Sequence, residues 1–263
     1  MRETRSAVWF LIALVLLTSC TELRDSAADS RPTTVSTLPD VTEHTPDPDA
    51  STTTAPSPAP TTSMTASVTI EPVPVEVQER MDDISMRAGC PVTYDDLRYL
   101  TVPYRGFDGT DHIGEMVVHR EVAQEVAGVF ESLFAAGYPI RQIRLVDDFG
   151  AADDPRDGAD DYASIEADNT SAFNCRRKVG SPGEMSQHSW GWAIDINPLE
   201  NPYVSADGTT AHRASIPFLD RTSPDPPVIA EGDPVVVAFD AIGWEWGGRW
   251  DSVKDYQHFS RAG

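Results

Sequence analysis

Basic residues are scarce in this sequence. The chain of 263 residues carries 20 Lys and Arg against 42 Asp and Glu, which gives a formal net charge of −22 at pH 7. A basic patch is the electrostatic footprint of nucleic-acid binding and of docking on anionic lipid. The charge balance therefore argues against both, and we expect no nucleic-acid partner.

Several catalytic signatures are also absent. There is no Gly-x-Ser-x-Gly sequence, which argues against a serine hydrolase of the nucleophile-elbow type. The acidic residues of segment 147–168 do not match an EF-hand calcium loop. His119-x-Glu121 matches the first half of an iron-oxygenase triad, but it opens an amphipathic segment, where Glu favours a helix N-terminus.

The apolar run near the N-terminus is short. Residues 7–17 are apolar, which is less than a membrane span needs and typical of a secretory signal peptide, with Arg2 and Arg5 before it. Leu17-Thr18-Ser19-Cys20 follows and resembles the bacterial lipobox, in which the cysteine is lipidated. We expect residues 1–20 to be a lipoprotein signal peptide, and Cys20 to hold the protein outside the cytoplasm on the cell membrane by this lipid anchor alone. The alternative is a plain signal peptide.

Cysteine is rare as well, with 3 in the chain. Once Cys20 is assigned to lipidation, Cys90 and Cys175 remain, and neither belongs to the Cys-x-x-Cys unit typical of zinc sites. In an oxidising compartment two remaining cysteines most simply pair. We therefore predict a disulfide between Cys90 and Cys175.

Large apolar residues are nearly missing from residues 21–72, which are rich in Thr, Ser, Pro, Asp and Ala. Such a segment cannot bury enough apolar area to offset the entropy of ordering it, so it is predicted to be a disordered tether. The folded domain is then residues 73–263. Short strands and helices are interspersed there, which indicates an α+β domain with a small, mostly antiparallel sheet packed by helices.

Periodicity, caps and breakers predict individual elements within this domain. Helices are expected over residues 75–88, 119–136 and 235–242, and strands over residues 97–104, 113–119, 140–146, 173–178 and 192–196. Segments 147–168 and 197–227 are expected to be loops, the first of them exposed.

The chemistry of the chain is concentrated in two stretches. His188 and Asp195 are seven residues apart in segment 186–198, and His258 lies near the C-terminus with Asp255 three residues before it. A catalytic zinc site needs three protein ligands, an open position for water and a general base. We predict that His188, Asp195 and His258 bind one zinc ion and that Asp255 activates the water.

The developing oxyanion also needs a positive group, and Arg176 is the candidate. Ser186-x-His188-x-x-Gly191-x-Ala193-x-Asp195, followed by Asp255-x-x-His258-Phe259, resembles the zinc D-alanyl-D-alanine carboxypeptidases and L-alanyl-D-glutamate endopeptidases. That group includes the D,D-peptidases of vancomycin resistance and several phage endolysins, and it shares a fold with the hedgehog signalling domain. The resemblance extends over roughly residues 95–260.

This resemblance implies a zinc metallopeptidase that hydrolyses peptidoglycan stem peptides, and we expect the protein to be a monomer. It implies the same three ligands and the same base, and contacts of Arg176 and Ser186 with substrate. Carboxypeptidase and endopeptidase members share the metal site, so the bond that is cleaved stays open. One departure is Ser260, where the family usually has Glu after His-Phe. Ser260 favours an alternative, a catalytically weak, zinc-stabilised module that binds the cell wall, whereas the intact Asp255 favours the enzyme.

Overall fold

The structure is a computed structural model that describes residues 67–222 and 227–261. The described residues lie in one compact unit. The predicted signal peptide, Cys20 and the tether up to residue 66 lie outside the described residues. None of the helices within the described ranges has the length and hydrophobicity that a membrane span requires.

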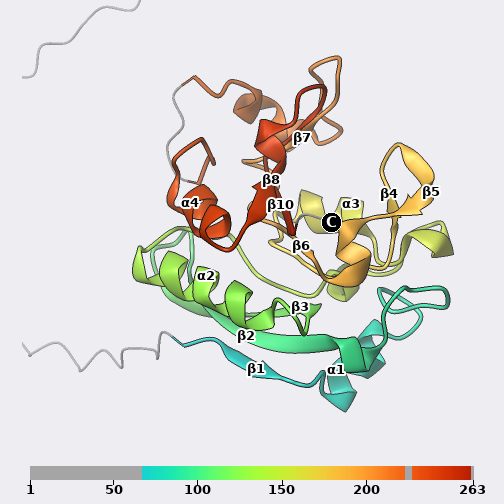
Figure 1. Cartoon of the computed structure of the whole chain (residues 1–263). Coiled ribbons are helices and arrows are strands. Elements are labelled where there is room, and N and C mark those ends of the chain that lie inside the picture. The colour runs from blue at the N-terminus through green and yellow to red at the C-terminus, as the bar shows by residue number, and fades with distance from the viewer. Residues whose placement is uncertain (1–66, 223–226, 262–263) are drawn as a thin grey trace, which may run out of the picture. The chain divides into compact units, whose positions relative to one another are not determined.

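Short helices and strands alternate along the described chain (Figure 1). The α-helices are α1 Val75–Met81, α2 Ala123–Ala135, α3 Asp161–Glu166 and α4 Pro234–Ala241. The strands are β1 Thr69–Glu71, β2 Leu97–Arg105, β3 Asp111–His119, β4 Arg177–Lys178, β5 Ser181–Met185, β6 Ala193–Asp195, β7 Tyr203–Val204, β8 Trp244–Trp246, β9 Lys254–Asp255 and β10 His258–Arg261. Short 3-10 helices cover Tyr94–Asp96, Val146–Phe149, Pro155–Asp157, Gln187–Trp190, Arg213–Leu219 and Gly247–Arg249.

The strands form small antiparallel sheets, so the predicted α+β class is confirmed. One sheet has the order β1-β2-β3 and another has the order β6-β10-β8. Two further pairs, β4 with β5 and β7 with β9, complete the strand pairing in the described residues. The β6–β10–β8 sheet carries Asp195 and His258, and it is separate from the long β2–β3 hairpin.

Helix α2 is the centre of the hydrophobic core. It packs against β1, β2 and α4, and Figure 1 shows it lying along the β2–β3 hairpin with α4 on its other side. Its Val126, Phe130 and Leu133 recur at helical spacing and are buried. Ile194 and Phe259 of the β6–β10–β8 sheet join the same core, so α2 links the two three-stranded sheets.

The predicted disulfide between Cys90 and Cys175 is confirmed, and it joins segments 85 residues apart. Cys175 is fully buried in a second apolar cluster with Met81, Leu97 and Phe173. The bridge therefore fixes the backbone just before Arg176 to the N-terminal part of the domain.

Two predicted boundaries near the start of the domain are wrong. Residues 69–71, which were assigned to the tether, form β1 and pair with residues 99–101 of β2. The predicted helix 75–88 ends at Met81, because Asp82 takes an extended conformation and Asp83 a positive φ of 60°. Asp side chains bond to nearby backbone and so favour turns over helix interiors.

The predicted strand over residues 140–146 is wrong. Two of its backbone N–H groups bond to side-chain amides: Arg141 to Asn197 Oδ1 at 3.0 Å, and Arg144 to Asn169 Oδ1 at 2.9 Å. These amides take the place of a strand ladder, and only isolated bridges involve this segment. A strand over residues 173–178 is also wrong except for Arg177–Lys178.

The two segments predicted as loops contain regular structure. Segment 147–168 holds α3, which begins where the Asp160 side chain accepts a hydrogen bond from Ala163 N, and its Asp147 and Asp168 are buried rather than exposed. Segment 197–227 holds β7 and the 3-10 helix Arg213–Leu219. The expected α4 is confirmed, with Asp233 as its N-cap and Pro234 at its first turn.

A pair of glycine substitutions tests how the two halves of the fold are joined. Gly191 has a φ of +70°, and a Cβ there would lie 2.6 Å from His119 N at the end of β3. We expect Gly191→Ala to lower the free energy of unfolding by more than about 2 kcal/mol, because it adds strain in the left-handed region to a backbone clash. Chemical denaturation measures the change.

Gly128 provides the control, because it lies on the exposed face of α2 and a Cβ there would meet no atom within 4 Å. Gly128→Ala should raise the free energy of unfolding by about 0.5–1 kcal/mol. Equal effects of the two substitutions would contradict the close approach of Gly191 to β3.

Candidate metal centre

Asp195 and His258 face each other across two antiparallel strands. Asp195 ends β6, His258 begins β10, and the register pairs them directly. Directly opposed residues have their Cβ atoms about 4.5–5.5 Å apart on one face of a sheet. Asp195 Oδ1 accordingly lies 2.9 Å from His258 Nδ1, although the two residues are 63 positions apart in the chain.

His188 reaches the same point from a 3-10 turn. Its turn, Gln187–Trp190, begins at Ser186, whose side chain accepts a hydrogen bond from His188 N at 3.4 Å. The turn ends at Gly191, where the positive φ reverses the chain into β6. The spacing of seven residues between His188 and Asp195 is therefore a turn followed by a strand.

The tautomer of His188 leaves one nitrogen free to bind a cation. His188 Nδ1 donates a hydrogen bond to the Ala172 carbonyl at 2.5 Å, so Nε2 is the nitrogen that carries the lone pair in the neutral imidazole. Nε2 lies 3.1 Å from Asp195 Oδ2 and makes no hydrogen bond to any residue in the described part of the chain. With protonated His188 this contact is an ion pair, and with neutral His188 two acceptors face each other. An acceptor pair of this kind fits a positive ion between its members.

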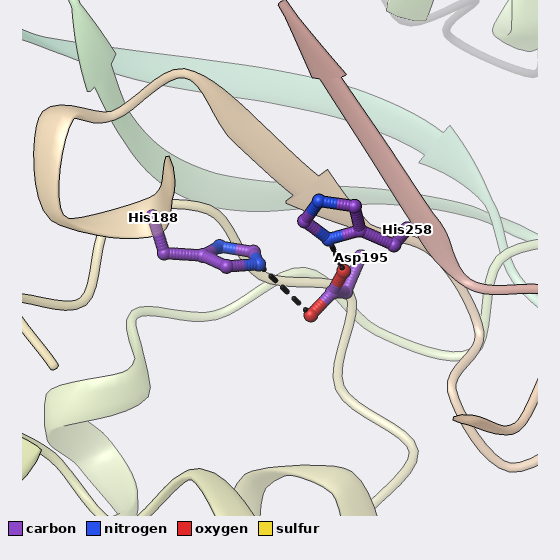
Figure 2. A group of neighbouring side chains, drawn as sticks. All are labelled: His188, Asp195 and His258. Atoms are coloured by element: carbon purple, nitrogen blue, oxygen red, sulfur yellow. Dashed lines mark hydrogen bonds and ion pairs between the residues drawn. The ribbon is translucent and has the colours of Figure 1, made fainter. Parts of the chain in front are cut away.

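The three side chains together form a compact donor set (Figure 2). One ligand atom from each of His188, Asp195 and His258 lies within 4.8 Å of the others. All three residues are buried, with exposed fractions of 2%, 3% and 8%. Within residues 67–222 and 227–261, this is the one group of three or more such side chains with this geometry.

The electrostatics of Asp195 favour its charged form. Burial raises the pKa of this carboxyl, but the charges and hydrogen bonds of His188 and His258 outweigh burial and lower the pKa well below its usual range. Asp195 is therefore an anion, and a buried anion needs positive charge beside it. Two imidazoles and one carboxylate are a suitable ligand set for zinc.

Asp255 lies beside this donor set in β9. Burial is the main cause that raises the pKa of its carboxyl to about 7. The charges of His258 and Arg176 lower this pKa, and the charge of Asp195 raises it. Its Oδ1 is buried without a partner among the described residues. Asp255 can lie this close to residue 247 only because that residue is glycine, since a Cβ at Gly247 would lie 2.6 Å from the Asp255 carbonyl oxygen. A buried carboxyl with a raised pKa suits proton transfer near neutral pH.

Arg176 is held by an acidic partner that the sequence analysis did not single out. Its Nη2 lies 3.2 Å from Asp161 Oδ2 in α3, and its backbone N donates to Ser189 Oγ at 3.1 Å. Its side chain is 12% exposed. Arg176 therefore has a fixed position next to the turn that carries His188.

These groups open onto a cleft with a volume of about 1080 Å³. Asp255, His258, Arg176 and Ser186 line it, while His188 and Asp195 lie beneath its surface. The structure thus brings together every residue that the sequence analysis placed at the site. Ser186 also caps the 3-10 turn, so its contact with substrate stays a prediction.

Two features of the site have little or no signal in the sequence. The bond to His188 Nδ1 comes from a backbone carbonyl, and any residue type at position 172 would supply it. Asp161 is one of many acids in segment 147–168, and only the start of α3 distinguishes it. The other histidines that the structure describes, His112, His119 and His212, do not belong to the donor set; His212, for example, bonds to Glu166 Oε1 at 2.7 Å.

A three-residue donor set beneath a cleft, with a buried carboxyl and an arginine beside it, has the composition of a metallohydrolase site. Residues 179–261 match the family model described as D-alanyl-D-alanine carboxypeptidase. This match confirms the resemblance seen in the motifs and supports a peptidase at the level of that family. No curated protein and no solved structure matches the chain.

Zinc binding tests the donor set directly. The full chain should bind one equivalent of zinc, and His258→Ala should lower the affinity by at least about 100-fold, because a buried ligand is lost. Titration with a zinc-sensitive chelator measures this.

His212→Ala is the matched control, since His212 is also buried but pairs with Glu166. It should leave zinc affinity unchanged. Equal losses in the two variants would contradict the assignment of the donor set.

Proposed function

We propose that this protein is a zinc metallopeptidase that hydrolyses stem peptides of bacterial peptidoglycan, as a carboxypeptidase or as an endopeptidase. The observation that carries the proposal is the acceptor pair between His188 Nε2 and Asp195 Oδ2, with His258 completing the set. The match of residues 179–261 to the carboxypeptidase family supports the choice of substrate.

Each residue has a distinct role in this proposal. His188, Asp195 and His258 hold the zinc, which supplies Lewis acidity to the peptide carbonyl and to water. Asp255 takes a proton from the attacking water and later gives it to the leaving amine, for which its raised pKa is suited. Arg176 donates hydrogen bonds to the oxygen that becomes negative during the attack.

Loss of the base should separate catalysis from metal binding. Asp255→Asn keeps the shape of the side chain but cannot accept the proton, so kcat should fall by about 100-fold or more. Zinc affinity should remain within a few-fold of wild type. The measurement is cleavage of synthetic stem peptides, with products identified by mass spectrometry, which also shows which bond is cut.

Asp251→Asn serves as the control, because Asp251 is exposed and lies outside the cleft lining. Its activity should equal that of the wild type. A wild-type chain that binds zinc but cleaves no stem peptide would reject the proposed function.

That result would favour a second function, a zinc-stabilised module that binds the cell wall with little catalysis. Ser260 on β10 is the feature that points to it, because the family that the motifs resemble usually has Glu at this position, and this chain lacks that carboxylate beside the donor set. Binding to purified sacculi without release of peptides would identify this function.

We also propose that the protein acts outside the cytoplasm, attached to the cell membrane by acyl chains on Cys20 and separated from it by the tether. Cys20→Ala should move the protein from the membrane fraction to the soluble fraction, because the acyl chains are its predicted anchor. Fractionation and immunoblotting measure this distribution. Retention of the variant in the membrane fraction would contradict the lipoprotein assignment.

A further inference from the structure

The β6–β10–β8 sheet has one face in the core and one face toward the cleft. Ile194 and Trp246 are each paired with Phe259 on the neighbouring strands, and all three side chains are buried in the core. On the other face, Ser260 follows His258 by two residues and lines the cleft with it. Alternation therefore places Ser260 beside the donor set on the same face.

Glu245 extends this face onto the edge strand. The register pairs Ser260 with Glu245 of β8 directly, and Glu245 also lines the cleft. Two residues along a strand and one strand spacing across place the Glu245 Cα roughly 8 Å from that of His258. Ser260 is small, so it leaves space between the donor set and the Glu245 carboxylate.

The other carboxylates of the cleft lining are occupied, apart from the base Asp255. Asp161 pairs with Arg176, Asp157 pairs with Arg177 at 2.6 Å, and Glu184 lies 3.9 Å from Lys178. Asp160 caps α3. Glu245, in contrast, is exposed and makes no hydrogen bond or ion pair with any residue that the structure describes.

We propose that Glu245 binds an ammonium group of the substrate, the side-chain amine of a diamino residue two positions from the cleaved bond. The proposal rests on the proposed function and adds a determinant of substrate choice to it. An extended peptide advances about 3.3 Å per residue, so two residues cover about 7 Å, which is close to the spacing between the Cα atoms of Glu245 and His258. A free carboxylate at that distance discriminates a charged amine from a blocked one.

Two synthetic stem peptides that differ only in this amine, free or acetylated, test the proposal with the purified, zinc-loaded full chain. The wild type should cleave the free-amine peptide with a kcat/KM about three- to fivefold higher, the size expected for one solvent-accessible ion pair. Glu245→Gln should lose this preference by slowing cleavage of the free-amine peptide alone. Glu184→Gln removes a cleft carboxylate that already faces Lys178, and it should keep the preference.

Three results would overturn the proposal: no preference in the wild type, the same preference in Glu245→Gln, or equal slowing of both peptides in that variant. If the wild type cleaves neither peptide, the proposed function fails separately. Calorimetric binding of the two peptides to the wild type and to Glu245→Gln then decides the role of Glu245, because this readout needs no turnover. Tighter binding of the free amine that depends on Glu245 supports the proposal, and equal binding overturns it.

Discussion

The antiparallel pairing of β6 with β10 is the constraint on which the site depends. It places Asp195 opposite His258, and a shift of one residue would turn one of the two side chains to the other face. The register is fixed from the opposite side of the sheet, where Ile194 and Phe259 are fully buried in the core around α2. The geometry of a polar site is therefore held by apolar burial on the far face, and the ligands themselves need not supply the energy of strand pairing.

The buried ligands also set a condition on stability. Three polar side chains are removed from water, and hydrogen bonds from the protein satisfy only part of them: the Ala172 carbonyl orients His188, and His258 bonds to Asp195. The facing lone pairs of His188 and Asp195 repel each other unless a proton or a metal ion lies between them. Metal binding and folding of this sheet are consequently linked, since an ion that binds only the folded chain stabilises it.

The sequence carried enough information for the motifs and for the strongly periodic elements, but not for the segments stabilised by side-chain amides. The donor set follows from residue types at fixed spacing, and α2 follows from its apolar repeat. Residues 140–146 look like a strand because four of the seven are large and apolar. Two of the backbone N–H groups in this segment nevertheless donate hydrogen bonds to the side-chain amides of Asn169 and Asn197, which are distant in the sequence. The start of α3 is obscured by the acidic composition around it, so the partner of Arg176 could not be identified before the fold was known.

The two segments predicted as loops have a larger part in the site than their composition indicates. β7 pairs with β9, with Tyr203 opposite Asp255, so the position of the proposed base depends on segment 197–227. Across the cleft, α3 holds Arg176 through Asp161, and its Tyr162 stacks on His212 with ring centroids 4.4 Å apart. The base and the arginine are thus each anchored in one of these segments, and the segments contact each other. Differences in these segments between related proteins would alter both the shape of the cleft and the placement of Asp255 and Arg176, so under the proposed function substrate choice and catalytic geometry cannot vary independently in this architecture.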